Sequence, residues 1–141
     1  MPRGVRGPAG DDRPGEGAPA MREPGSPAAT VRTTEQDGVP VTAVAGEIDA
    51  DSVAPVRAEV CAQLGRRPDA LVLDLCSVSF LGSAGLTMLL DAHHRASRDG
   101  VSLAVVAGRR QVLRLLAVTE LDHVFAVHPT VSAALAATRP A

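Results

Sequence analysis

The stretch from Leu71 to Leu90 constrains the fold of this chain more than any other. It begins with a nearly continuous apolar run over Leu71 to Leu75, which is typical of a central strand covered on its faces. The small residues Gly82-Ser83-Ala84-Gly85 follow, and apolar side chains then recur at helical spacing. A buried strand, a short loop and a helix in this order predict an α/β domain with the Ser83 hydroxyl at the start of the helix.

The flanking segments continue the same alternation. The runs Val31 to Thr34 and Val39 to Ala45 surround the polar turn Gln36-Asp37-Gly38 and predict a hairpin. The other expected elements are a helix from about Val53 to Gly65 capped by Asp51 or Ser52, a helix from about Ser83 to Arg98 stopped by Gly100, a strand over Val101 to Val106, a helix over Arg109 to Val118, a strand over His123 to Val127 and a helix after Pro129-Thr130. This order predicts a mixed sheet of four to five strands, parallel at its centre, with about four helices packed on it.

Composition separates the first 29 residues from the rest. Residues 1–29 contain six Gly and six Pro among scattered charges, so they predict a disordered tail, and residues 30–138 form the expected domain. The net charge is −2 and the basic residues are all dispersed arginines, which argues against a nucleic-acid or membrane surface. Aromatic stacking platforms are also scarce. We therefore expect a cytoplasmic protein without a nucleic-acid or membrane partner.

The residues around Ser83 do not match the signature of a serine hydrolase. A nucleophile elbow requires Gly-x-Ser-x-Gly, and the chain has Leu81 where the first glycine should stand. Asp91, the nearest acidic residue after the serine, lies two turns down the same predicted helix. The sequence therefore predicts that the protein is not an enzyme and has no catalytic residue.

Metal and cofactor sites are likewise not expected. His93 and His94 are adjacent, so their side chains diverge by about 100° on a helix and cannot chelate one ion as an i, i+4 pair would. The chain contains no lysine and therefore no phosphate-binding loop of the P-loop type. Two interpretations of Ser83 remain open on these grounds, a plain helix cap and a functional hydroxyl beside an anion-favouring helix terminus.

Three motifs, taken in order, resemble the STAS domain, and specifically the stand-alone bacterial anti-sigma factor antagonists. The first is Gly46-Glu47-Ile48-Asp49, similar to the family's Gly-Glu-x-Asp. The second is Leu73-Asp74-Leu75 followed by Val78 to Leu86, similar to its Asp-Leu…Phe-Asp-Ser-x-Gly-Leu. The third is Val112-Leu113-Arg114-Leu115-Leu116 with Thr119, Leu121 and Phe125. The resemblance covers about residues 30–138.

This resemblance implies a function by protein binding. An antagonist of this family binds an anti-sigma factor with a kinase-type ATPase fold and so releases a sigma factor. The anti-sigma factor phosphorylates the antagonist on a loop serine, which ends the interaction, and a phosphatase resets it. On this resemblance Ser83 is the expected phosphoacceptor, and an anti-sigma factor and a phosphatase are the expected partners.

The resemblance also implies a contact surface. Its expected partner-binding residues are Gly46, Glu47, Asp49, Phe80, Leu81, Gly82, Ser83, Ala84, Gly85 and Leu86. Asp74, near the predicted end of its strand, is expected to organise the Ser83 loop by accepting backbone N–H groups. Glu47 and Asp49 can equally be capping residues at the entry to the next helix.

One position departs from the family pattern. Gly82 stands where family members typically carry Asp before the phosphorylated serine. An alternative function therefore stays open. In it the protein is a scaffold, or a signalling module of the same fold that binds a nucleotide or another small ligand, and it is not regulated at Ser83.

Overall fold

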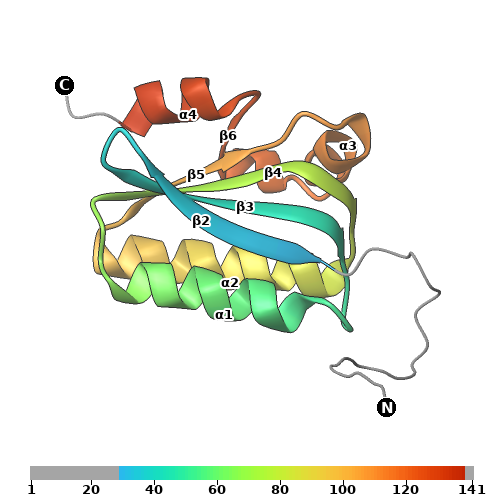
Figure 1. Ribbon diagram of the computed structural model, residues 1–141. Helices are drawn as coiled ribbons and strands as arrows, with labels where there is room; N and C mark the ends of the chain where they lie inside the picture. Colours follow the sequence, from blue (N-terminus) through green and yellow to red (C-terminus); the bar gives the residue numbers. More distant parts are fainter. Residues whose placement is uncertain (1–28, 139–141) are drawn as a thin grey trace, which may run out of the picture.

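The computed structural model describes residues 29–138. The predicted tail, residues 1–29, therefore lies almost wholly outside the described residues. In chain order the elements are β2 (Thr30–Gln36), β3 (Val39–Ile48), α1 (Val53–Gly65), β4 (Ala70–Leu81), α2 (Ser83–Asp99), β5 (Ser102–Val106), α3 (Arg110–Val118), the 3-10 helix η2 (Leu121–His123), β6 (Ala126–His128) and α4 (Val131–Thr138), as Figure 1 shows.

The strands form one mixed sheet in the order β2-β3-β4-β5-β6. β2 and β3 make the predicted antiparallel hairpin, while β3, β4, β5 and β6 are parallel to one another. The carboxyl ends of the parallel strands therefore meet at one edge of the sheet. In Figure 1 the ends of β3 and β4 and the beginning of α2 lie at the same end of the molecule. Both the mixed sheet and its parallel centre confirm the prediction.

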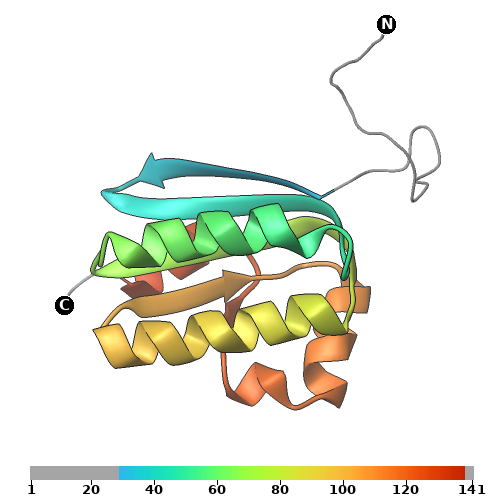
Figure 2. The same ribbon diagram turned by 90° about the horizontal axis from the view of Figure 1, so that it is seen from below.

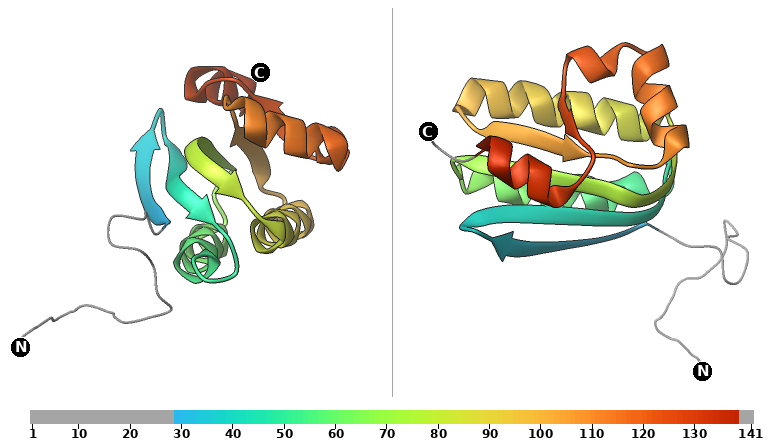
Figure 3. Two further views of the ribbon diagram at one scale, coloured as in Figure 1. Left: turned by 90° about the vertical axis from the view of Figure 1, so that its right-hand side faces the viewer. Right: turned by 90° about the horizontal axis from the view of Figure 1, so that it is seen from above.

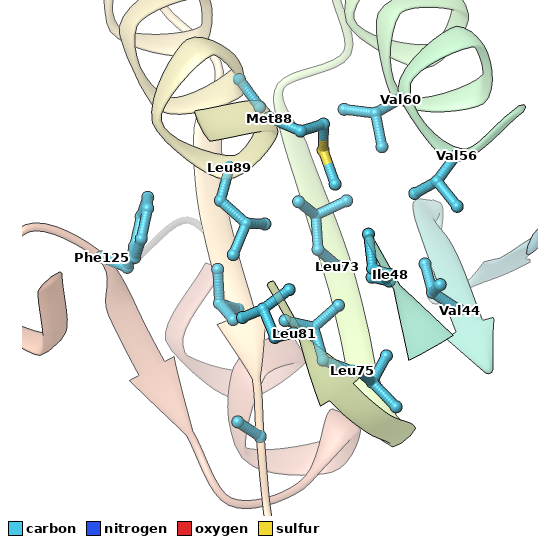
Figure 4. Packing of buried hydrophobic residues seen from close by; sticks show 14 of the residues in the cluster. Val44, Ile48, Val56, Val60, Leu73, Leu75, Leu81, Met88, Leu89 and Phe125 are labelled. Atoms are coloured by element: carbon cyan, nitrogen blue, oxygen red, sulfur yellow. The ribbon is translucent and has the colours of Figure 1, made fainter. Parts of the chain in front are cut away.

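Helices cover the two faces of the sheet unequally. α1 and α2 lie side by side on one face (Figure 2), and α4 lies on the other (Figure 3). The larger apolar cluster fills the space under α1 and α2, where Val56, Val60, Met88 and Leu89 point toward Ile48 and Leu73 of the sheet (Figure 4). A smaller cluster beneath α4 contains Val41, Val72, Ala104, Val106, Ala134 and Leu135. β4 is buried on both faces at its start, as the apolar run predicts.

The predicted strand ends require correction. β4 continues to Leu81 instead of ending at Leu75, and β3 continues to Ile48, so most of the predicted Gly46–Asp49 turn is strand. Two shifts in register between these strands each leave an extra residue in β4, and such bulges let a strand with polar residues at Ser77 and Ser79 continue pairing. The last strand, predicted over His123 to Val127, is Ala126–His128 because His123 belongs to η2.

Candidate functional site

Pairing between β3 and β4 brings the two predicted motifs together. Glu47 is opposite Phe80, and Ile48 is opposite Leu81, at the carboxyl end of the sheet. The backbone N–H of Gly82 continues this pairing by donating to the carbonyl oxygen of Ile48 at 2.8 Å. The segments 46–49 and 80–86, far apart in the sequence, therefore form one edge of the molecule.

Ser83 is the first residue of α2, and its side chain is exposed. Gly82 occupies the N-cap position, and no side chain makes a capping hydrogen bond there, so the interpretation of Ser83 as the cap is wrong. The first helical bond runs from the N–H of Leu86 to the carbonyl oxygen of Gly82. The N–H groups of the first turn therefore stay available beside the Ser83 hydroxyl, at the positive end of the helix dipole.

Two glycines allow the close approach of these elements. A Cβ on Gly85 would lie 2.5 Å from Cδ1 of Leu81 and 3.0 Å from Cγ2 of Ile48. Because Gly85 has no side chain, α2 can pack directly against the ends of β3 and β4. A Cβ on Gly82 would lie 3.2 Å from Cε2 of Phe80 and 3.5 Å from the Ile48 carbonyl oxygen, which is tight but open to adjustment. The φ of Gly82 is −87°, a value that any residue adopts.

The segment 80–86 divides into surface and supporting residues. Phe80 is 52% exposed and Ser83 is exposed, so both side chains can meet a partner. Leu81 and Gly85 are buried in the interface between α2 and the sheet. Two of the predicted partner-binding residues, Leu81 and Gly85, therefore lie beneath the surface and support it.

Asp49 serves the entry to α1. One oxygen of its carboxylate accepts the backbone N–H groups of Asp51 and Ser52, at 3.1 and 3.2 Å. The Ser52 hydroxyl accepts the Asp49 N–H and donates to the Glu47 carbonyl oxygen, at 3.0 and 2.5 Å. Ser52 stands at the predicted N-cap, yet its side chain faces back toward β3 and makes no capping bond with the helix. The Asp49 carboxylate therefore orders the turn that leads into α1, and it does not cap the helix itself, because the N–H groups it accepts precede Val53.

Asp74 lies within β4, seven residues before its end, because the strand is longer than predicted. Its carboxylate accepts the backbone N–H of Cys76 at 3.0 Å, where the register with β3 shifts. Burial, together with the Asp74 carboxylate, raises the pKa of the Cys76 thiol. The hydrogen bond of Asp74 thus supports the bulge in β4, and it does not reach the segment 80–86.

The structure adds a groove that the sequence did not predict. A hollow of about 330 Å³ lies between the end of β4 and α3, lined by Ser79, Phe80, Leu81, Gln111, Val112 and Leu115. The Arg109 guanidinium donates to the Cys76 carbonyl oxygen at 3.2 Å, just before α3 begins. The sequence predicts the helix itself, but no local pattern in it indicates how the helix crosses β4.

The described part of the chain holds no cluster of three or more His, Cys, Asp or Glu able to bind a metal ion. His93 is half-buried with its ring edge against Phe125, and His94 is exposed, as their adjacency requires. Within residues 29–138 no helix combines the length and the apolar character needed to span a bilayer.

The model of the STAS domain family matches residues 30–134. The chain belongs to the STAS domain family. This match includes the edge formed by segments 46–49 and 80–86, and it agrees with the mixed sheet and its helices. The STAS domain resemblance that the motifs carry is therefore confirmed.

Several proteins that are similar to this chain are anti-sigma factor antagonists. The anti-sigma-F factor antagonist RsfB of Mycobacterium tuberculosis is 33% identical over 110 residues, which are 78% of this STAS chain and 89% of RsfB. The crystal structure of an anti-sigma factor antagonist from Mycobacterium paratuberculosis matches with a TM-score of 0.74 and 36% identity, over 80% of this chain and 96% of that one. SpoIIAA in its unphosphorylated form, at 15% identity and a TM-score of 0.63, over 75% of this chain and 93% of that one, shares the fold.

Proposed function

We propose that this STAS protein binds an anti-sigma factor of the serine-kinase type and thereby frees a sigma factor. One observation carries the proposal, namely the exposed Ser83 hydroxyl at the first residue of α2, beside the exposed ring of Phe80. The names of the relatives support the same role, since RsfB counteracts an anti-sigma factor.

The chemistry of this edge suits a protein partner. The small residues Gly82 and Ala84 leave the backbone beside Ser83 with little side-chain cover, so a partner can approach closely. Phe80 supplies an aromatic contact, the type of residue that often dominates binding energy. Asp49, tied to the entry of α1, holds the neighbouring segment 46–49 in place.

Phosphorylation of Ser83 is the proposed switch. The Ser83 Oγ attacks the γ-phosphorus of ATP held by the partner, the new O–P bond replaces the bond to ADP, and the hydroxyl proton passes to a base of the kinase. The phosphate adds about −1.5 to −2 charges and opposes an apolar contact at Phe80. Because a helix N-terminus favours an anion, the modification changes the surface and leaves the fold intact. A phosphatase restores the hydroxyl.

Binding is tested with purified proteins. The wild type, Ser83→Ala and Ser83→Glu are each titrated with every serine-kinase anti-sigma factor of the source organism, in the presence of ADP. We expect the wild type and Ser83→Ala to bind one such factor and Ser83→Glu to bind at least about tenfold more weakly, because it brings a negative charge to the contact. Absence of binding by the wild type contradicts the proposal.

The switch is tested separately with ATP. Incubation of the bound pair with ATP should add one phosphate, which mass spectrometry places on Ser83, and Ser83→Ala should remain unmodified. If the two proteins bind but Ser83 stays unmodified, this STAS protein is an antagonist that is controlled by other means. Binding of nucleotide by the STAS protein itself, without any anti-sigma factor, would favour the signalling-module alternative.

A further inference from the structure

Phe80 is the exposed one of the two phenylalanines in the chain. Its side chain is 52% exposed, whereas Phe125 is buried at 5%. An exposed ring at a surface groove is a typical anchor for a protein partner, because covering it removes a large apolar area from water. Phe80 borders the 330 Å³ groove that leads from the end of β4 to α3.

α3 supplies the opposite wall of this groove, hereafter the Phe80–α3 groove. Gln111, Leu115 and Val118 are spaced i, i+4, i+7, which places them on one side of the helix. Gln111 and Leu115 line the groove, and Val118 extends the same stripe with 76% of its side chain exposed. Val112 and Leu116 are buried and hold the helix on the core. The apolar wall therefore continues from the groove onto open surface.

One exposed arginine adjoins this stripe. Arg114 and Val118 are spaced i, i+4, so Arg114 lies next to the Val118 end of the stripe, and α3 contains no acidic residue. The Arg114 guanidinium makes no ion pair with a carboxylate among the described residues. Arg110, about 140° from Leu115 around the helix, lies away from the groove. The apolar stripe thus ends beside an arginine without a carboxylate partner.

We propose that the Phe80–α3 groove receives an apolar side chain of the anti-sigma factor, from a segment that also carries a carboxylate. The apolar side chain fills the space between Phe80 and Leu115, and the carboxylate faces Arg114. The inference rests on the proposed function and extends the contact surface from the Ser83 edge to α3. It gives the exposed ring of Phe80 and the unpaired charge of Arg114 one common ligand.

Paired substitutions on α3 test this inference. Val118→Asp places a carboxylate on the groove side, and Leu113→Asp places one on a position that is 40% exposed and about 140° away around the helix. Arg114→Glu reverses the charge beside the stripe, and Arg32→Glu on exposed β2 is its control. Each variant is titrated with the purified serine-kinase anti-sigma factor of the source organism that binds the wild type, and thermal unfolding confirms its fold.

We expect Val118→Asp and Arg114→Glu each to weaken binding about tenfold or more, with Leu113→Asp and Arg32→Glu within about twofold of the wild type. The salt dependence of association should also decrease in Arg114→Glu. If Ser83→Glu prevents binding while the groove variants bind like the wild type, this inference is overturned and the proposed function stands. If the wild type binds no anti-sigma factor, both fail. The inference is also overturned if Val118→Asp and Arg114→Glu weaken binding no more than their controls do.

Discussion

The backbone N–H of Gly82 donates to the carbonyl oxygen of Ile48, with 2.8 Å between nitrogen and oxygen. This bond joins the residue before Ser83 to the last residue of β3, next to Asp49. The start of α2 and the entry to α1 are therefore fixed to each other through the ends of two neighbouring strands.

Asp49→Ala should lower stability without a specific loss of binding. The substitution removes the acceptor of the Asp51 and Ser52 N–H groups, and loss of such hydrogen bonds costs about 1 kcal/mol. Urea unfolding measures the loss, and titration with the anti-sigma factor measures the affinity. Glu47→Ala is the control for the unfolding measurement, because no hydrogen bond of the Glu47 side chain is present in the described structure. A binding defect in Asp49→Ala with unchanged stability would show that Asp49 contacts the partner directly.

Gly85→Ala should destabilise the domain. The added methyl group would meet Leu81 at 2.5 Å and Ile48 at 3.0 Å, and both neighbours are buried. Overpacking of this kind costs about 1–3 kcal/mol, and the clash at 2.5 Å places it in the upper part of this range, above the gain of roughly 1 kcal/mol from alanine in a helix. Gly108→Ala is the matched control, because its methyl group would lie 3.8 Å or more from its neighbours. Equal unfolding midpoints for the two variants would contradict the packing argument.

Lowering the pH should weaken the contact between Glu59 of α1 and Thr33 of β2. Hydrogen bonds from Thr33, at 2.5 Å, and Gln63, at 3.0 Å, lower the pKa of the Glu59 carboxyl. A lowered pKa means that this carboxylate contributes stability above its usual pKa of about 4.3, and that the contribution disappears as pH falls through the lowered value.

The stability of the wild type relative to Glu59→Gln should therefore be greater at neutral pH than at about pH 3. Glu35→Gln, which changes an exposed carboxyl on β2, serves as the control. Urea unfolding at a series of pH values measures both differences. A difference for Glu59→Gln that does not change with pH would mean that the carboxylate contributes nothing to the pairing with Thr33.

The position of Ser83 could be predicted from the sequence because it lies in the run of small residues 82–85, directly before the apolar residues at helical spacing. This run, the helical spacing after it and the apolar run Leu71 to Leu75 before it each depend on neighbouring residues alone. The junction between strand and helix therefore follows without knowledge of the fold. Gly85 itself then fits a place where a side chain would collide with Leu81 and Ile48.

The second half of β4 could not be predicted in the same way. Ser77 and Ser79 interrupt the apolar pattern, and the bulges that accommodate them exist only in the pairing with β3. The structure gives Asp74 a role that differs from the predicted one for the same reason. Because β4 is longer than predicted, the Asp74 carboxylate lies far from Ser83 along the strand and accepts the N–H of Cys76. The groove beside Phe80 depends on how α3 crosses β4, which is a tertiary relationship without a local pattern.

Gly82→Asp restores the residue that STAS antagonists typically carry before their serine, and it should stabilise this protein. At the N-cap, the new carboxylate can accept the N–H of Ala84 or Gly85 and meets the positive end of the helix dipole, for a net gain of about 0.5 kcal/mol. The half-exposed ring of Phe80, 3.2 Å from the added Cβ, can move aside by the small distance required.

Ser97→Asp, an exposed substitution in the last turn of the same helix, is the matched control and should destabilise because it adds a negative charge at the opposite end. Urea unfolding at pH 7 measures both changes. A loss of stability in Gly82→Asp would mean that Phe80 is held firmly against the helix start and cannot make room for the new side chain.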